Sequence, residues 1–261
     1  MSRVSDRLNR LSYSQTFVMS NKARDMKAAG IDVISLTLGE PDFDVPDNIK
    51  KAAFDAINEN YSHYSPVPGF LELRKAIVNK LKRDNNLDYK PTQICVANGA
   101  KQNIFNVLAA LVNEGDEVIL PAPYWVSYDE MVKINGGVSV FIETNIDTEF
   151  KMTAEQLEAA ITPKTKAVLY SSPCNPSGSY YTREELEKIA NVMAKYPDVV
   201  IISDEIYEFI NYDGEHVSIA EFPQVFNQTA VINGMSKAFA MTGWRIGYSA
   251  CPEWLAKACD K

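Results

Sequence analysis

The sequence predicts an α/β fold, with a mainly parallel sheet of about seven strands, helices on both faces, and the N-terminal part of a smaller domain. From residue 94 onward, short runs rich in Val and Ile alternate with longer helical stretches. These runs are apolar at consecutive positions, as is typical of parallel strands buried on both faces. Two stretches, TAEQ at 153–156 and TREE at 182–185, have the spacing of a capping box, which marks the start of a helix.

The expected elements can be placed in chain order. A helical pattern around 15–29 leads to a strand and a turn-rich segment within 31–46, and a loop at 59–69 precedes a helix over 70–85. The strands of the sheet are expected at 94–97 (ICVA), 118–121 (VILP), 138–142 (VSVFI), 166–170 (KAVLY), 199–203 (VVIIS), 230–233 (AVIN) and 246–250 (IGYSA).

Length and composition limit the function. The 261 residues suffice for a large domain, expected over 46–261, with 1–45 as part of a small domain. A net charge of −8 without a basic block argues against binding to nucleic acid or to a membrane surface. Four cysteines without CxxC spacing indicate a reducing, cytoplasmic location. Two histidines, His63 and His216, are too few for a histidine-built metal site.

Polar side chains gather where the expected strands end. Ligands of open parallel sheets bind beyond the carboxyl ends of the strands, so the loops at those ends should form one site. Five such loops present Gly99, Lys101, Trp125, Asn175, Asp204, Tyr207 and Lys237. This convergence on one sheet edge is stronger evidence for a site than any single motif.

The loop at 98–102 has the features of an anion site. Gly99 precedes the start of a helix, where unpaired N–H groups and the helix dipole favour a phosphate. Arg245 offers a guanidinium that can bind phosphate through two hydrogen bonds.

The other loops carry groups suited to an aromatic aldehyde. Trp125 provides a flat face for a ring, and Asp204, after a buried strand, needs a cationic partner such as a protonated ring nitrogen. Tyr207 and Asn175 can donate to a ring oxygen, and Lys237 is the amine that can form a Schiff base with an aldehyde. Together these groups describe a site for pyridoxal phosphate.

The chain resembles the fold-type-I pyridoxal-phosphate-dependent aminotransferases, in the bacterial-type aspartate aminotransferase branch. The resemblance covers nearly the whole chain and rests on these segments in order: GEPDFDVP, NGAKQ, PYWVSY, SPCNPSG, SDEIYE and SKAFAMTGWRIGY. The last is very specific, whereas SPCNPSG and SDEIYE are strong only in combination.

The resemblance implies roles around the cofactor ring. Lys237 would hold the cofactor through the Schiff base, and Asp204 would pair with the pyridinium nitrogen. Asn175 and Tyr207 would bind the 3′-oxygen, and Trp125 would stack on the ring. Lys237, Asp204 and Tyr207 are the expected catalytic residues.

The resemblance also implies a phosphate site, a substrate site and a homodimer. Gly99, the backbone at Ala100 and Lys101, and the side chain of Arg245 would hold the phosphate. Tyr64 would reach the phosphate of the neighbouring subunit. The expected substrate contacts are Gly39, Trp125, Asn175, Lys101 and Thr16.

Two positions depart from the family's pattern. Gly234 stands where the family often has a phosphate-binding serine, and Ser236 is expected to compensate. The family's arginine for the substrate α-carboxylate lies in a C-terminal small domain, whereas this chain stops at PEWLAKACDK. We therefore expect a C-terminally truncated chain that lacks this domain.

By resemblance, the expected reaction is a ping-pong transamination through aldimines, which moves the amino group of aspartate to 2-oxoglutarate. The partners are small amino acids and 2-oxo acids, with Lys101 and Thr16 at the distal carboxylate.

Prephenate or aromatic substrates stay open. So does another enzyme of this fold type, such as a carbon–sulfur lyase or a cyclopropane-forming synthase. A cofactor-sensing transcription regulator is disfavoured, because it would need a winged-helix module. A nicotinamide-binding protein is disfavoured as well, because no GxGxxG follows the first strand of the sheet.

Each of these residues also has an ordinary structural explanation. Asp204 could cap a helix, and Asn175 could shape a turn between two prolines. Trp125 and Tyr207 could be core aromatics, and Lys101 could lie on a helix surface. The remaining candidates are explained as loop, turn or ion-pairing residues: Gly99, Tyr64, Arg245 and Lys237. All of these explanations together would require several coincidences on one sheet edge.

Overall fold

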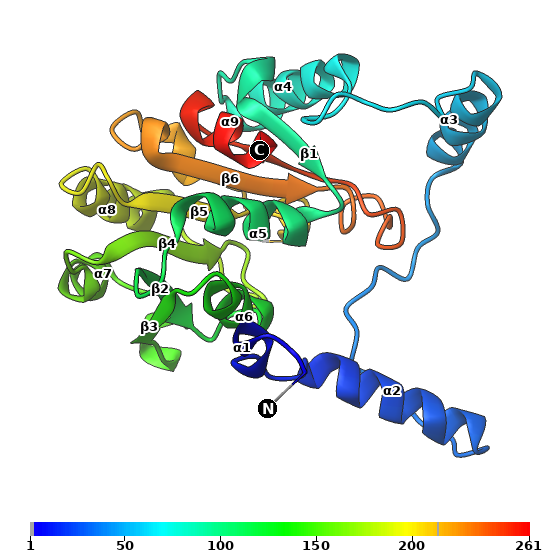
Figure 1. Cartoon of the computed structure of the whole chain (residues 1–261), viewed down its shortest axis with the longest axis horizontal. Coiled ribbons are helices and arrows are strands. Elements are labelled where there is room, and N and C mark those ends of the chain that lie inside the picture. Colours follow the sequence, from blue (N-terminus) through cyan, green and yellow to red (C-terminus); the bar gives the residue numbers. More distant parts are fainter. Residues whose placement is uncertain (1–2, 213) are drawn as a thin grey trace.

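A computed structural model describes residues 3–212 and 214–261, and its centre is a seven-stranded sheet (Figure 1). The strand order is β1-β7-β6-β5-β4-β2-β3. The strands are β1 (Ile94–Ala97), β2 (Glu117–Ala122), β3 (Val138–Glu143), β4 (Thr165–Ser171), β5 (Val200–Asp204), β6 (Thr229–Gly234) and β7 (Gly247–Ala250). Each lies within two residues of the range that the sequence predicts, so the predicted α/β fold is confirmed.

Strand direction explains why five loops meet at one edge. The pairs β2–β3, β2–β4, β4–β5 and β5–β6 are parallel, whereas β7 is antiparallel to both β6 and β1. Therefore β1 runs in the same direction as β6, and the end of β1 lies at the same edge as the ends of β2, β4, β5 and β6. The start of β7 lies at that edge too, so the loop from β6 to β7 carries both Lys237 and Arg245 there.

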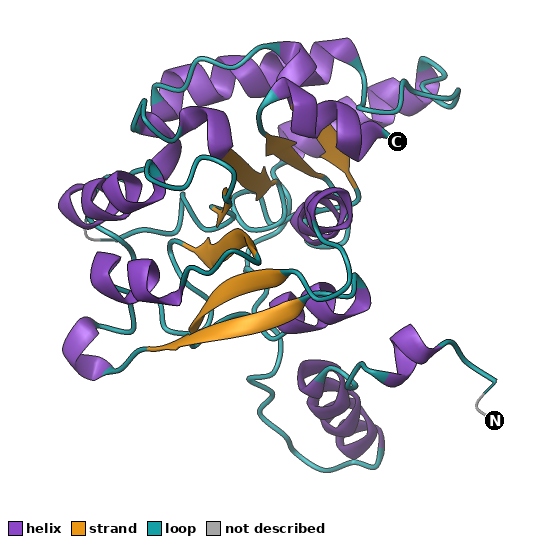
Figure 2. Cartoon of the chain, turned by 60° about the vertical axis from the view of Figure 1, so that its left-hand side comes forward, coloured by secondary structure: helices purple, strands orange, loops and turns teal. Residues whose placement is uncertain are grey.

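Helices cover both faces of the sheet (Figures 1 and 2). The helices of the described residues are α1 (Asp6–Asn9), α2 (Gln15–Ala28), α3 (Asp47–Asn58), α4 (Leu71–Asn85), α5 (Ala100–Leu111), α6 (Ser127–Ile134), α7 (Ala154–Ala160), α8 (Arg183–Met193) and α9 (Glu253–Asp260), and α4 to α9 pack on the sheet. Thr153 and Thr182 accept hydrogen bonds from the backbone N–H groups of Gln156 and Glu185, so both predicted capping boxes are present.

Neighbouring residues of one strand pack into different cores. Val118 and Leu120 of β2 join a cluster with α5, α6 and α9, whereas Ile119 joins a second cluster with α7 and α8. Strands β4 and β5 alternate in the same way, and α4 packs on the β1, β7 and β6 end of the sheet. Burial on both faces is the reason that these strands are apolar at consecutive positions.

The N-terminal part of the chain lies outside these layers. Helices α2 and α3 project from the body, joined by an extended segment (Figure 1). The strand predicted after Ile31 is wrong: residues 31–36 form no strand, and Ile34 and Leu36 are 88% and 92% exposed. A β-strand requires hydrogen bonds to a neighbouring strand, and this segment has none among the described residues. Within those residues, no helix is long and apolar enough to cross a membrane.

Candidate active site

A pocket of about 1180 Å³ opens at the edge of the sheet where the five loops meet. Eleven of the predicted site residues line it: Thr16, Gly39, Ala100, Lys101, Trp125, Asn175, Asp204, Tyr207, Ser236, Lys237 and Arg245. Gly99 lies directly before Ala100, against the guanidinium of Arg245. Tyr64 does not line the pocket, and its side chain is fully exposed.

Lys237 is half-buried in the loop that follows β6, and it lines the pocket. The Nζ atom donates a hydrogen bond to the carbonyl of Gly39 at 2.6 Å and lies 5.8 Å from the centre of the Tyr207 ring. Burial lowers the pKa of Lys237 below its usual value, the Glu40 carboxylate opposes this shift, and Arg245 adds to it. A lysine with a lowered pKa has more of its amine in the free, nucleophilic form at neutral pH.

Asp204 ends β5 and is buried, with 3% of its surface exposed. Its carboxylate accepts hydrogen bonds from the hydroxyl of Tyr128 at 2.6 Å and from the backbone N–H of Ile206 at 3.2 Å. Burial raises the pKa of Asp204 to about 6, although both hydrogen bonds oppose the shift. A buried carboxylate in this state gains most from a cationic partner, which a protonated ring nitrogen can provide.

Tyr128 is a site residue that the sequence analysis missed. It is almost completely buried and holds the Asp204 carboxylate, and its ring packs edge-on against Trp125 with 5.5 Å between centres. The available signal was its position three residues after Trp125, in the first turn of α6, where its backbone N–H donates to the Trp125 carbonyl at 2.9 Å.

Three further side chains that line the pocket are Asn175, Tyr207 and Lys101. The amide nitrogen of Asn175 lies 3.5 Å from the hydroxyl of Tyr207, so both can donate to one acceptor. The amine of Lys101 lies 5.4 Å from the centre of the Trp125 ring. Burial and the nearby Arg245 lower the pKa of Lys101. The wall near Lys101 therefore carries positive charge beside an aromatic face.

Gly99 and Arg245 form a cradle at the start of α5. Gly99 adopts φ +91°, and a Cβ atom there would collide with the Arg245 guanidinium. The guanidinium donates to the carbonyls of Thr242 at 2.9 Å and Asn98 at 3.1 Å, which fixes it beside the helix. The first N–H groups of a helix have no partner within the helix, so this cradle combines free donors with a fixed cation.

Changing Gly99 to Ala is expected to weaken phosphate binding. The substitution strains a left-handed backbone and displaces the guanidinium, so the dissociation constant for pyridoxal phosphate should rise about 10-fold or more. Fluorescence titration measures this constant. Gly115→Ala is the matched control, because Gly115 has φ +83° but nothing lies within 4 Å of the added Cβ. Both variants should lose about 1 kcal/mol of unfolding free energy, and equal affinities in the two would contradict the cradle.

The structure explains why glycine stands at position 234. A Cβ atom on Gly234 would lie 2.8 Å from the carbonyl oxygen of Ile246 and 2.9 Å from the Cα of Gly247. A serine would not fit there unless β6 and β7 moved apart. Ser236 lines the pocket two residues later, and its role at the phosphate stays a prediction.

Buried charges behind the site hold the turn that carries Asp204 and Tyr207. Glu205 accepts hydrogen bonds from Ser203 and Ser218 and pairs with His216 at 3.0 Å, and Glu208 pairs with Lys80. Although burial acts in the opposite direction, Glu205 raises the pKa of His216 above its usual value. Each of the two carboxylates thus has a basic partner within the protein.

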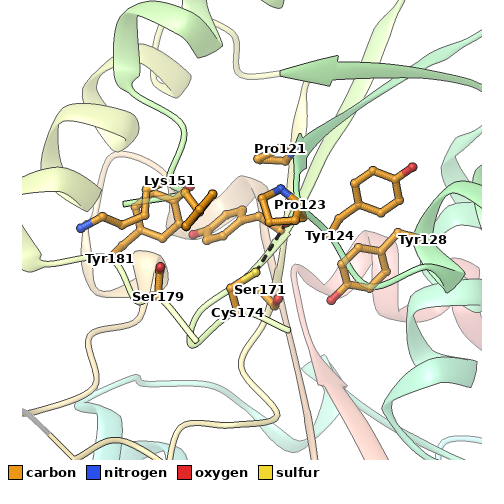
Figure 3. Close-up of a pocket in the computed structure, with 11 residues that line it drawn as sticks. Pro121, Pro123, Tyr124, Tyr128, Lys151, Ser171, Cys174, Ser179 and Tyr181 are labelled. Carbon is orange, nitrogen blue, oxygen red and sulfur yellow. Dashed lines mark hydrogen bonds between the residues drawn. The ribbon is translucent and has the colours of Figure 1, made fainter. Parts of the chain in front are cut away.

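A second, much smaller cavity lies beside the main pocket (Figure 3). Its volume is about 10 Å³, and its walls include Tyr128, Tyr181 and the thiol of Cys174, which points toward the Pro123 carbonyl. A space of this size holds about one water molecule, so it is not a ligand site.

The donor set of the main pocket fits pyridoxal phosphate. The cradle at Gly99 and Arg245 suits the phosphate, and the buried Asp204 suits a protonated ring nitrogen. The amine of Lys237, with its lowered pKa, suits an aldehyde. Each group of this cofactor therefore has a complementary group within one pocket.

The chain is similar to a known protein family and to curated proteins of other organisms. The family model described as aminotransferase class I and II matches residues 31–261. The chain is 53% identical over 249 residues to an aspartate aminotransferase of Bacillus sp. (strain YM-2), covering 95% of this chain and 63% of the relative. It is 49% identical over 260 residues to an aspartate/prephenate aminotransferase of Cereibacter sphaeroides, covering 99% of this chain and 65% of the relative.

A solved structure agrees with these matches. The aspartate aminotransferase of Thermus thermophilus, solved with maleate, superposes with a TM-score of 0.96 at 42% sequence identity. The match covers 100% of this chain and 67% of that chain. This chain therefore spans about two thirds of the length of the proteins that it resembles.

Proposed function

Since the chain belongs to the class I and II aminotransferases, we propose that the protein transfers the amino group of aspartate to 2-oxoglutarate with pyridoxal phosphate as cofactor. One observation carries the proposal: Lys237, Asp204 and Arg245 lie in one pocket, at the end of the sheet where a phosphate can bind the start of α5. The names of the two curated relatives support aspartate as the donor.

Each side chain has a defined task in this reaction. When bound, pyridoxal phosphate supplies an aldehyde for the amino group and a ring that withdraws electrons from it. Arg245 and the N–H groups at the start of α5 bind the phosphate, and Asp204 keeps a proton on the ring nitrogen. Asn175 and Tyr207 donate hydrogen bonds to the ring oxygen. Lys237 removes the proton from the substrate's α-carbon and later returns a proton, as a general base and then a general acid.

The proposed substrate is a dicarboxylate. Lys101 and Thr16 line the same pocket as Lys237, and Lys101 offers a cation for a distal carboxylate. The Thermus thermophilus relative was solved with maleate, which is a dicarboxylate. The Cereibacter sphaeroides relative is also named for prephenate, so prephenate is the second candidate substrate.

The assay for this proposal mixes the full-length protein with aspartate and 2-oxoglutarate and measures oxaloacetate. Lys101→Met should raise the KM for aspartate about 10-fold, because the variant loses the cation that would bind the distal carboxylate of aspartate. The KM for a monocarboxylic amino acid should stay nearly unchanged, because such a substrate has no distal carboxylate. Sulfide or ammonia released without a 2-oxo acid acceptor would instead identify a lyase.

We also propose a homodimer and a cytoplasmic location. Tyr64 is fully exposed and lies outside its own pocket, and α3 projects from the body with Phe54 and Ile57 exposed (Figure 1). A second subunit would cover this surface and receive Tyr64. Sedimentation equilibrium should then give the mass of two chains.

Four unpaired cysteines support the cytoplasmic location. We likewise propose residues 1–45 as part of a small domain and 46–261 as the large domain.

A further inference from the structure

Two contacts tie the segment around Gly39 to the loop that carries Lys237. The carbonyl of Gly39 accepts the hydrogen bond from the Lys237 amine, and the hydroxyl of Thr242 donates to the Glu40 carboxylate at 2.7 Å. The partners are 198 and 202 positions apart in the sequence. The carbonyl of Thr242 in turn accepts from Arg245, so one residue holds both Glu40 and the phosphate-binding cation.

The charges around Lys237 come from four parts of the chain. Arg245 follows in the same loop and Lys101 lies on α5, and both are cations. The turn after β5 contributes Asp204, which is buried and hydrogen-bonded to Tyr128, and Tyr207, whose ring lies near the amine. The N-terminal segment contributes Glu40. Its carboxylate favours the protonated amine, whereas burial and Arg245 disfavour it.

We propose that Glu40 is the counter-charge of Lys237: held by Thr242, it keeps the 38–40 segment against the lysine loop and stabilises the protonated amine while Lys237 is not bonded to the cofactor. This inference rests on the proposed role of Lys237. Glu40 does not touch the reacting atoms and is therefore a positioning residue. It acts at the stage of the reaction at which the free lysine carries a proton.

The test follows how fast Lys237 bonds to pyridoxal phosphate in the full-length protein stripped of cofactor. In this step the Nζ–C bond forms and one water molecule leaves, and only the unprotonated amine reacts. The rate is read from the absorption of the lysine-bound cofactor across a pH series. Its midpoint reports the pKa of Lys237 without any turnover.

Glu40→Gln keeps a hydrogen-bond acceptor for Thr242 and removes the charge. Thr242 holds Glu40 next to Gly39, whose carbonyl binds the Lys237 amine, and the Glu40 carboxylate favours the protonated amine, so its removal should move the midpoint to lower pH. Well below the midpoint, bonding should then be about three-fold faster than in the wild type. The difference should shrink in 1 M salt.

Two variants complete the design. Thr242→Val keeps the charge but releases Glu40, so its shift should have the same direction and be smaller. Asp42→Asn removes an exposed carboxylate two residues away from Glu40, and it should leave the midpoint unchanged. An unchanged midpoint in Glu40→Gln, or an equal shift in Asp42→Asn, would overturn the inference. A missing absorption band in the wild type, or a band that persists in Lys237→Ala, would instead overturn the proposed function.

Discussion

Replacing Lys237 with alanine is expected to lower the turnover number by about 10⁴-fold or more, because one side chain serves as both the bond to the cofactor and the proton carrier. The methyl group of alanine can do neither. Pyridoxal phosphate should still bind, with lower affinity, because the cradle at Gly99 and Arg245 is unchanged. The measurement is the steady-state rate of oxaloacetate formation, together with the absorption spectrum of the bound cofactor.

The matched variant for this prediction is Lys237→Arg. It keeps a positive charge near Glu40, but a guanidinium stays protonated at neutral pH and cannot act as the nucleophile. We expect it to be as inactive as the alanine variant. Turnover close to that of the wild type in either variant would show that Lys237 is not the amine that bonds to the cofactor and carries the proton.

Replacing Asp204 with asparagine should lower activity and, without cofactor, make the fold more stable. Asparagine is nearly the same size and can still accept a hydrogen bond from Tyr128, but it has no negative charge to keep the ring nitrogen protonated. Turnover should fall by about 10²- to 10³-fold, the usual loss for a preorganised electrostatic partner.

The stability change depends on pH in a defined direction. Burial raises the pKa of Asp204 from 3.8 to about 6, so the folded protein binds this proton more tightly than the unfolded chain. The contribution of Asp204 to stability therefore falls as pH rises from about 4 to about 6 and stays low above that. At pH 7 the asparagine variant should gain up to about 3 kcal/mol of unfolding free energy. At pH 3.5 the gain should vanish.

Urea unfolding of the cofactor-free protein at the two pH values measures this difference. A stability gain that is the same at both pH values would show that Asp204 is not a buried charge in the folded protein. Adding pyridoxal phosphate should reverse the ranking at pH 7, because the cofactor stabilises the wild type more strongly.

The sheet and the residues of its loops could be predicted because both depend on local sequence. Runs such as 199–203 are apolar at consecutive positions, and this pattern fixes a strand buried on both faces. The polar residue directly after such a run then lies at the carboxyl edge of the sheet. Asp204 was found in this way and Lys237 in the loop after the next strand, and the structure places both in the pocket.

Contacts between distant segments could not be predicted from local patterns. The expected strand after Ile31 depends on a neighbouring strand that the described residues do not supply. The bonds from Tyr128 to Asp204 and from Thr242 to Glu40 join residues 76 and 202 positions apart. The sequence around each of these residues contains no motif that predicts its partner. Only the folded structure shows which residues form each pair.

The most direct test of the central claim is the absorption spectrum of the full-length protein with pyridoxal phosphate, recorded before and after aspartate is added. The account predicts a band of lysine-bound cofactor that converts to the band of the amine form, with one oxaloacetate released for each site. A lysine-bound band that ignores aspartate but responds to an aromatic amino acid would change the substrate and keep the cofactor. The absence of any lysine-bound band would contradict the role of Lys237 and with it the account.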